Sequence, residues 1–483
     1  MNLADYLLDQ RIVEGMGERM ALRTDRGDFS YAQVQGLANQ AAHWLAARGL
    51  QPEQRLLLAL PDSWEFVVAL FGALKLGAAV VMANPELSVD DLADLAQYVR
   101  AGVVLTTPGR ALFARELKNY PTTFDTFPCD YDDIALWLFS GGTTGKPKAV
   151  LQSHGSFRNT TERYAKDFLG YGPDDITLAV PKLYFGYATG SNLFFPFSVG
   201  ASAILFEDRP TPELLFEKIR AYRPSLLINV PTMVNQMTRH PQAGEQDLTS
   251  LRACTSAGEA LPESLHTRWN ELFGVELLDG LGTAEMWHIF LSNAPGQARP
   301  GSLGRAVPGF EVLACDAEGH EVPVGEIGQM WVRGDSRGLC YWQRRAESLR
   351  AFRGDTYVSN DLIRCDEEGY IYFCGRADEM LKVGGRWLEP QQVESVLLTH
   401  PQVAECAVVG HLGEDGLTRP KAFVVARIPG SAELEAELKQ HVLAALEPYK
   451  HPRRIHFVDS LPRTHLGKVN RAELRGWSPP DSV

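Results

Sequence analysis

The sequence predicts an α/β protein with a large N-terminal domain of parallel-sheet αβ layers, a small β subdomain, and a small mobile α+β domain at the C-terminus. Short apolar runs alternate with helical segments up to about residue 308; closely spaced strands and turns come next, and the final segment has strands and a helix of its own. With 483 residues, 45% of them hydrophobic, the chain has room for more than one core. We therefore expect an N-terminal domain of residues 1–377 and a C-terminal domain of residues 378–483.

The strand candidates of the large domain are short runs of apolar and β-branched residues. They are residues 56–60, 79–82, 103–106, 134–139, 176–180, 204–206 and 226–230. Between them, residues 39–47 and 212–221 have helical periodicity. This alternation is typical of sheets whose strands are mainly parallel.

The small subdomain and the C-terminal domain have their own candidates. Residues 328–332 and 370–373 are short strands that we expect to pair antiparallel. Residues 407–409 and 422–425 are strand candidates of the last domain. A helix there repeats apolar residues every four positions as a core-facing stripe: Leu434, Leu438, Val442 and Leu446.

Charge and cysteine usage exclude several classes of protein. The 47 Lys and Arg against 60 Asp and Glu give a net charge of −13 without a dense basic run, so we expect no nucleic-acid partner. The 7 cysteines form no C-x-x-C pair, which argues against a disulfide framework and a zinc site. No basic segment followed by an apolar stretch opens the chain, and Lys75 interrupts the most apolar segment. We expect a cytoplasmic protein without a membrane span.

Residues 140–148, Ser-Gly-Gly-Thr-Thr-Gly-Lys-Pro-Lys, directly follow a strand candidate. Glycines let backbone N–H groups face an anion, threonine hydroxyls donate to phosphate oxygens, and lysines add positive charge. The P-loop of kinases and GTPases is not matched, because Ser140 takes its first glycine position and Pro147 stands where a Mg²⁺-binding hydroxyl is needed. The alternative, an ordinary glycine turn without a ligand, does not require two threonines and two lysines. The predicted polyphosphate site comprises Ser140, Gly141, Gly142, Thr143, Thr144, Gly145, Lys146 and Lys148.

This loop resembles the phosphate-binding signature of the adenylate-forming superfamily, which comprises acyl- and aryl-CoA ligases, carrier-protein adenylation domains and luciferases. Residues 74–78 resemble an earlier element of that family, and further elements appear in order as far as Arg471. The resemblance implies ATP, Mg²⁺ and coenzyme A as ligands.

Two segments resemble the family's nucleotide-binding elements. Within residues 256–262 the resemblance implies that three residues face the adenine: Gly258, Glu259 and Ala260. Within residues 279–286 it implies five further nucleotide contacts: Asp279, Gly280, Leu281, Gly282 and Thr283. Glu285, with Thr144, would hold Mg²⁺ on the phosphates, since a hard cation prefers oxygen ligands. Glu285 alone would be taken for a surface carboxylate. The chain departs from the pattern at Ala284, where the family has threonine, and whether Thr283 compensates is left open, because neighbouring residues of an extended segment point to opposite sides.

The remaining motifs resemble the ribose site, the hinge and the catalytic lysine. Asp361 and Arg376 match the family's ribose-binding pair, a carboxylate being able to accept from two vicinal hydroxyls. Asp378 would be the hinge, and the next loop would line the thiol tunnel: Lys382, Gly384 and Gly385. Residues 462–471 resemble the closing motif, in which Lys468 would stabilise charge on the α-phosphate. Singly, Asp361 could be a turn residue and Lys468 a surface lysine, but the order of the motifs favours catalysis.

Two stretches, residues 184–201 and 285–293, resemble benzoate–CoA ligases, in which they wall the aryl pocket. A flat aromatic acid suits aromatic and aliphatic walls over a glycine floor. The implied pocket residues are Phe185, Gly186, Tyr187, Gly282, His288 and Ile289. That subfamily tends to carry alanine in place of Gly186, so we expect room for a ring substituent, as in 2-aminobenzoate (anthranilate), with His288 or a backbone carbonyl meeting it.

The expected function is that of an aryl-CoA ligase, which converts a benzoate-type acid and ATP to aryl-AMP and pyrophosphate and then passes the acyl group to coenzyme A. Lys468 would act in the first half-reaction, and a swing of the small domain about Asp378 would prepare the second. One alternative is an adenylation enzyme that loads a carrier protein. Another is a degenerate family member that binds nucleotide without catalysis, and the one residue that favours this alternative is Ala284.

Overall fold

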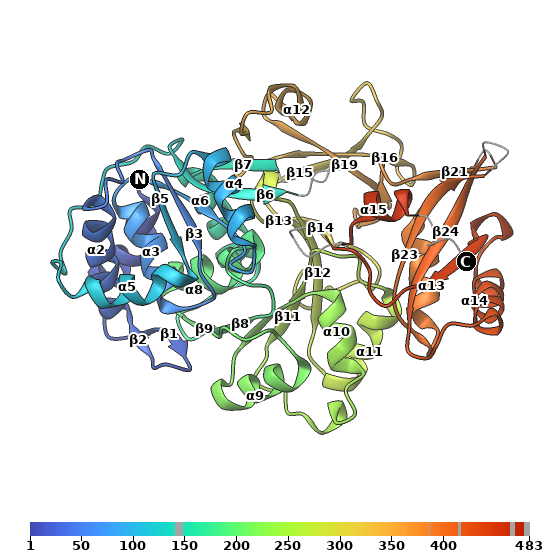
Figure 1. The fold of residues 1–483 in the computed structure, drawn as a ribbon, viewed down its shortest axis with the longest axis horizontal. Coiled ribbons are helices and arrows are strands. Elements are labelled where there is room, and N and C mark those ends of the chain that lie inside the picture. The colour runs from blue at the N-terminus through green and yellow to red at the C-terminus, as the bar shows by residue number, and fades with distance from the viewer. Residues whose placement is uncertain (141–147, 385, 414–416, 464–468, 478–483) are drawn as a thin grey trace.

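The protein has the predicted α/β class, with two large sheets, a smaller antiparallel sheet and a C-terminal α+β unit (Figure 1). The computed structural model describes residues 1–140, 148–384, 386–413, 417–463 and 469–477. In Figure 1 the N-terminal sheet and its helices lie on the left, and the C-terminal strands lie on the right.

A six-stranded sheet, ordered β17-β7-β6-β4-β3-β5, forms the first layer. Its strands are β3 (Arg55–Ala59), β4 (Ala79–Met82), β5 (Val103–Thr106), β6 (Ile134–Ser140), β7 (Lys148–Ser153) and β17 (Cys340–Tyr341). The four strands from β5 to β6 are parallel, as predicted, whereas β7 pairs antiparallel with β6, and β17 pairs antiparallel with β7. Helix α3 (Trp64–Lys75) packs so closely on α2 (Tyr31–Ala46) that a Cβ on Gly72 would lie 2.7 Å from that of Ala41.

The second layer is a nine-stranded sheet, ordered β14-β13-β12-β11-β10-β8-β9-β1-β2. Its strands are β1 (Met20–Thr24), β2 (Phe29–Ser30), β8 (Ile176–Ala179), β9 (Ser202–Leu205), β10 (Leu226–Asn229), β11 (Ala253–Ser256), β12 (Leu277–Gly282), β13 (Ile289–Ser292) and β14 (Arg305–Ala306). The strands from β1 to β12 are parallel, and β13 turns back antiparallel to β12. The glycine-containing segments predicted to bind nucleotide lie at or after the carboxyl ends of β11 and β12, the edge at which open α/β sheets bind ligands.

The predicted antiparallel subdomain is confirmed. It contains β15 (Glu311–Cys315), β16 (Ile327–Arg333), β18 (Phe352–Arg353), β19 (Thr356–Cys365) and β20 (Ile371–Arg376). Each neighbouring pair is antiparallel.

The C-terminal unit has a hydrophobic core of its own. Its strands are β21 (Leu381–Val383), β22 (Arg386–Leu388), β23 (Val403–Leu412), β24 (Thr418–Ala426) and β25 (Arg454–Phe457). The predicted stripe of α14 (Ala432–Ala445) is buried at Leu434, Leu438 and Val442, and the helix ends one residue before Leu446. This core begins at Leu381, which agrees with the predicted boundary at 377/378; the boundary itself stays a prediction.

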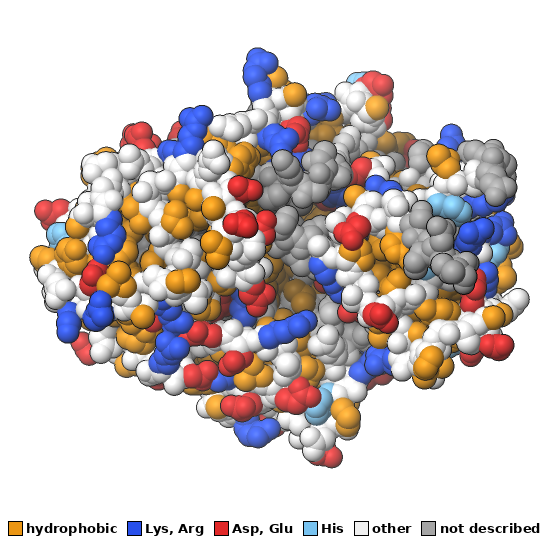
Figure 2. Space-filling view, in the orientation of Figure 1, with side chains coloured by type: hydrophobic (Ala, Val, Ile, Leu, Met, Phe, Trp, Pro, Cys, Tyr) orange, Lys and Arg blue, Asp and Glu red, His pale blue; other side chains and the backbone are white. Residues whose placement is uncertain are grey.

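The other helices complete the layers. They are α1 (Gln10–Val13), α4 (Val89–Val99), α5 (Thr107–Leu117), α6 (His154–Thr160), α7 (Gly186–Thr189), α8 (Phe195–Val199), α9 (Pro212–Tyr222), α10 (Pro231–Thr238), α11 (Glu263–Phe273), α12 (Arg345–Ala351), α13 (Pro390–Thr399) and α15 (Arg471–Gly476). Among the helices of the described ranges, none is long and apolar enough to cross a membrane. Acidic and basic side chains are interspersed over the face shown in Figure 2.

Candidate active site

The two strands that flank the predicted phosphate loop meet at Ser140 and Lys148, which are partners in the antiparallel pair of β6 and β7. Nζ of Lys148 lies 2.9 Å from Oε2 of Glu347 on α12, and 5.1 Å from the centre of the Tyr341 ring. The other predicted residues of this loop lie outside the described residues: Gly141, Gly142, Thr143, Thr144, Gly145 and Lys146.

Glu285 is a buried carboxylate held by contacts from other elements. It lies in a short 3₁₀ helix (Ala284–Met286), and the residue is 5% exposed. The Tyr341 hydroxyl donates to Oε1 of Glu285 over 2.8 Å, and the Gly338 N–H donates to the Glu285 carbonyl over 2.6 Å. Burial, with Glu285 adjacent, raises the pKa of Tyr341, so its phenol remains a donor. Sequence reasoning missed Tyr341.

Thr283 caps the same short helix. Its Oγ1 accepts a hydrogen bond from the Met286 N–H over 3.2 Å. The hydroxyl oxygen therefore has a local structural role, one that the sequence pattern did not indicate, and compensation for Ala284 stays an open prediction.

Trp287 reverses the chain two residues after Glu285. Its backbone has φ 62° and ψ −53°, and the His288 N–H donates to the Met286 carbonyl over 2.8 Å. These values describe a γ-turn with positive φ, which is rare and strained. The buried indole packs against Phe157, with ring centres 4.4 Å apart, which holds the turn in place.

The two stretches predicted to wall an aryl pocket are in contact. Nε2 of His288 lies 3.0 Å from the Tyr187 carbonyl oxygen, and their rings are 5.4 Å apart. A Cβ on Gly282 would lie 2.5 Å from the His288 carbonyl oxygen, so this position requires glycine. Ile289 is buried next to His288, and Phe185 precedes helix α7.

Gly186 is bordered by other groups. A Cβ there would lie 3.2 Å from Cδ1 of Leu138 and 3.3 Å from the Trp287 carbonyl oxygen. A methyl group at this position would therefore lie where α7, β6 and the Trp287 turn meet. A small shift of these neighbours would be enough to admit alanine.

His288 is a neutral imidazole with one defined tautomer. Burial lowers its pKa to about 3. Nε2 is within hydrogen-bond distance of the Tyr187 carbonyl, which can only accept, and of the Ser191 hydroxyl, which can accept or donate. A hydrogen on Nε2 satisfies both contacts, and in that tautomer Nδ1 is an acceptor. Nδ1 is buried and lacks a hydrogen-bond partner among the residues that the structure describes.

The predicted ribose and hinge residues form one ion-pair chain. Nη1 of Arg376 lies 3.2 Å from Oδ1 of Asp361, and its Nε lies 3.1 Å from Oδ1 of Asp378. The Ser359 hydroxyl donates to the second oxygen of Asp361 over 2.8 Å. Burial lowers the pKa of Arg376, but the two carboxylates outweigh it and the net shift is upward.

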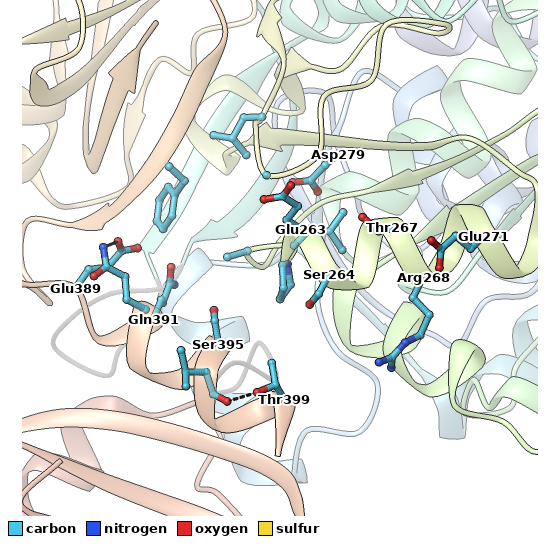
Figure 3. Close-up of a pocket in the computed structure, with 18 residues that line it drawn as sticks. Glu263, Ser264, Thr267, Arg268, Glu271, Asp279, Glu389, Gln391, Ser395 and Thr399 are labelled. Carbon is cyan, nitrogen blue, oxygen red and sulfur yellow. Dashed lines mark hydrogen bonds between the residues drawn. The ribbon is translucent and has the colours of Figure 1, made fainter. Parts of the chain in front are cut away.

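The predicted adenine-facing residues border a cavity of about 870 Å³ between α11 and α13 (Figure 3). Ala260 and Asp279 line it, and Gly258 and Glu259 adjoin Ala260. Its charged lining consists mainly of carboxylates, with one arginine: Glu263, Glu271, Asp279, Glu389 and Arg268. Burial raises the pKa of Asp279 well above its usual range. This lining suits an uncharged base better than phosphates.

The remaining predicted residues belong to the C-terminal unit. Lys382 lies on β21, and Gly384, with φ 57°, is in the turn after that strand. Gly385 and Lys468 lie outside the described residues.

Comparison with known proteins identifies the family to which the chain belongs. A family model described as AMP-binding enzyme matches residues 9–342, and one described as AMP-binding enzyme C-terminal domain matches residues 392–468. The chain belongs to the AMP-binding enzyme family. The predicted superfamily is thereby confirmed.

This AMP-binding enzyme is similar over its whole length to ligases of aromatic acids. The benzoate–CoA ligase of Thauera aromatica is 37% identical, with 98% of this chain and 95% of that protein covered. The structure of the anthranilate CoA ligase AuaEII in complex with anthranoyl-AMP has a TM-score of 0.92 at 34% identity, covering 99% of this chain and 97% of that one. A benzoate CoA ligase from Burkholderia xenovorans LB400 has a TM-score of 0.89 at 35% identity, covering 98% and 100%.

The site fits a magnesium ion held largely by nucleotide. Within the described ranges, no three His, Cys, Asp or Glu side chains gather into a group that could hold a metal ion. Mg²⁺ is usually bound by one or two carboxylates together with substrate phosphates and water. The buried carboxylate of Glu285 suits that arrangement.

Proposed function

We propose that this AMP-binding enzyme is an AMP-forming aryl-CoA ligase that activates a benzoate-type acid. The observation that carries the proposal is the turn at residues 285–288, which begins at the buried carboxylate of Glu285 and ends at His288, the residue in contact with Tyr187. The full-length similarity to benzoate and anthranilate CoA ligases supports it.

In the first half-reaction, a carboxylate oxygen of the acid attacks the α-phosphorus of ATP, and pyrophosphate leaves. Asp361 and Arg376 hold the ribose, the segment ending at Ala260 faces adenine, and the ammonium of Lys468 stabilises the charge that develops on the α-phosphate. Mg²⁺, held by Glu285 and Thr144, would neutralise charge on the phosphates.

In the second half-reaction, the thiol sulfur of coenzyme A attacks the carbonyl carbon of aryl-AMP, the thioester bond forms, and AMP leaves. Rotation of residues 378–483 about Asp378 withdraws Lys468 and brings the loop of Lys382, Gly384 and Gly385 to the thiol's path. A carrier protein carries the same type of thiol, but no contact among the described residues favours it.

His288 supports a ring substituent that can donate a hydrogen bond. Its buried Nδ1 is an acceptor without a donor among the described residues, and an unsatisfied buried acceptor costs about 1–3 kcal/mol. The amino group of 2-aminobenzoate or a ring hydroxyl offers that donor, whereas benzoate does not. Gly186 lies next to the same wall, where an added methyl group would press on Leu138 and on the Trp287 carbonyl.

The decisive experiment supplies ATP, Mg²⁺, coenzyme A and a panel of benzoates, and measures pyrophosphate and thioester. The panel compares benzoate, 2-methylbenzoate and 2-aminobenzoate, because methyl and amino groups differ little in size but only the amino group donates. Thioester formation is expected, with the amino compound preferred over the methyl compound. Absence of pyrophosphate release with every aromatic acid would refute the ligase; adenylate that accumulates with coenzyme A present would point to a carrier protein.

A further inference from the structure

We infer that Tyr341 is the positioning residue for the metal-binding carboxylate of Glu285. The inference deepens the proposed function, because it depends on Glu285 holding Mg²⁺. It starts from the direct contact: the phenol donates to Oε1 over 2.8 Å, and both side chains are buried, with residue exposures of 6% and 5%.

The contact is built by distant parts of the chain. Tyr341 lies on β17, which pairs with β7 through Val150, and 56 residues separate it from Glu285. The tyrosine backbone is thus fixed by the strand that begins at Lys148, next to the predicted phosphate loop. Through this strand pairing and its hydroxyl, Tyr341 connects β7 with the carboxylate of Glu285.

Hydrogen bonds hold the backbone of residues 284–285, so the part of Glu285 that can still change its orientation is the side chain with its carboxylate. Nε2 of Gln152 donates to the Ala284 carbonyl over 2.7 Å, and the Gly338 N–H donates to the Glu285 carbonyl. A Cβ on Gly338 would lie 2.8 Å from Val150 and 3.2 Å from the Glu285 carbonyl oxygen, so glycine permits this approach. With the backbone held, the phenol selects the orientation of the side chain.

The occupied oxygen also limits how the metal is bound. A carboxylate oxygen that accepts from a phenol is a weaker ligand, so Glu285 would offer the ion mainly its other oxygen. Hydrogen bonds of this kind orient metal ligands, and their removal typically costs about 10–100-fold in metal affinity or activity.

Lys148 adds a second contact to the same phenol. Its ammonium lies 5.1 Å from the ring centre and is paired with Glu347 over 2.9 Å. A cation over the ring face holds the ring plane without using the hydroxyl. The hydroxyl stays directed at Glu285.

The test is the substitution Tyr341→Phe, with Tyr6→Phe as matched control. Tyr6 also donates to a glutamate, Glu162, over 2.5 Å, so the control removes the same kind of bond outside the site. Two quantities are measured: the gain in ATP affinity caused by Mg²⁺, by calorimetry, and the Mg²⁺ concentration at half-maximal pyrophosphate release.

For Tyr341→Phe the Mg²⁺-dependent gain in ATP affinity is expected to fall, and the half-maximal Mg²⁺ concentration to rise about 10-fold or more, with kcat largely restored at saturating Mg²⁺ and KM for the acid unchanged. Tyr6→Phe should leave the Mg²⁺-dependent gain in ATP affinity and the half-maximal Mg²⁺ concentration as they are in the parent protein. An unaltered Mg²⁺ requirement in folded Tyr341→Phe overturns the inference.

A third variant, Glu285→Gln, keeps this outcome distinct from failure of the proposed function. It should abolish the Mg²⁺-dependent gain. If it does not, the assignment of Glu285 to the metal is wrong, whatever Tyr341 does. If the parent protein releases no pyrophosphate with any aromatic acid, the proposed ligase function itself fails.

Discussion

Asp361 and Arg376 face each other across strands β19 and β20, with Nη1 of the arginine 3.2 Å from Oδ1 of the aspartate. Because the Ser359 hydroxyl donates to the second oxygen, both oxygens of the carboxylate already have donors. A ribose bound here would add hydrogen bonds to oxygens whose positions are fixed in advance.

Asp361→Asn is therefore expected to weaken ATP binding. An asparagine amide would direct its own hydrogens at Arg376 or at Ser359, and hydrogen bonds to a charged group contribute about 1.5–3 kcal/mol, or about 10–150-fold in affinity. The KM for ATP should rise by about this factor, while the KM for the aromatic acid stays within about twofold. Equal changes in both constants would argue against a ribose role.

Lys468→Ala should separate the two half-reactions. Formation of aryl-AMP, measured by pyrophosphate release, should be lost almost completely, because alanine removes the ammonium that would stabilise the charge on the α-phosphate. Thioester synthesis from supplied aryl-AMP should continue. Lys439→Ala, which removes an ion pair with Glu435 on α14, is the control and should affect neither. Equal loss of both half-reactions would contradict the swinging domain.

Gly186→Ala should change the choice among acids. The new methyl group would press on Leu138 and on the Trp287 carbonyl, so the wall must shift by a few tenths of an ångström. We expect the ratio of kcat/KM for 2-aminobenzoate to that for benzoate to fall by about 1–3 kcal/mol in free energy, or about 5–150-fold. The melting temperature is measured alongside. An unchanged ratio in a folded variant would remove Gly186 from the specificity determinants.

Asp62→Asn should stabilise the protein at neutral and alkaline pH. Asp62 accepts from the Leu183 N–H over 2.8 Å, near Lys182 and Glu207, and its burial raises its pKa from 3.8 to about 6. A raised pKa gives stability that is fully present below pH 3.8 and lost as the pH rises through 6, by about 3 kcal/mol. Asparagine keeps an acceptor and does not titrate.

Denaturant unfolding at pH 5, 6.5 and 8 measures this difference. The free energy of unfolding of the variant should exceed that of the parent by a margin that grows from pH 5 to pH 6.5 and changes little from there to pH 8. A margin independent of pH would show that Asp62 does not titrate in this range.

The parallel strands could be predicted well from the sequence where both faces are buried. All four residues of β4 are buried, and such a strand is a continuous apolar run. Strand β12 escaped prediction as a strand because Asp279, Gly280 and Gly282 interrupt its apolar pattern. These residues are predicted to bind nucleotide, and the residue types suited to that role do not give the apolar pattern of a strand.

The start of α2 was predicted eight residues too late, at Asn39 instead of Tyr31. The signal was present in Ser30 and Gln33, which form a capping box in the structure. The apolar periodicity is clearest in the second half of the helix, and the prediction relied on it.

The candidate site was predictable where its residues lie in contiguous motifs. The contact between residues 184–201 and 285–293 agrees with the predicted aryl walls, though the roles of the individual residues remain predictions. The Tyr341–Glu285 hydrogen bond could not be foreseen, because it depends on pairing of β17 with β7. Nor does the sequence show that Trp287 has positive φ, a conformation usually left to glycine.

The reversal at Trp287 also separates two tasks along a very short piece of chain. In the proposed ligase, Glu285, before the turn, would serve chemistry common to every acid, whereas His288 and Ile289, which lead from the turn into β13, would meet the particular acid. A library that exchanges only positions 288 and 289 would thus alter the substrate range of the ligase as a self-contained cassette, leaving the machinery for nucleotide intact.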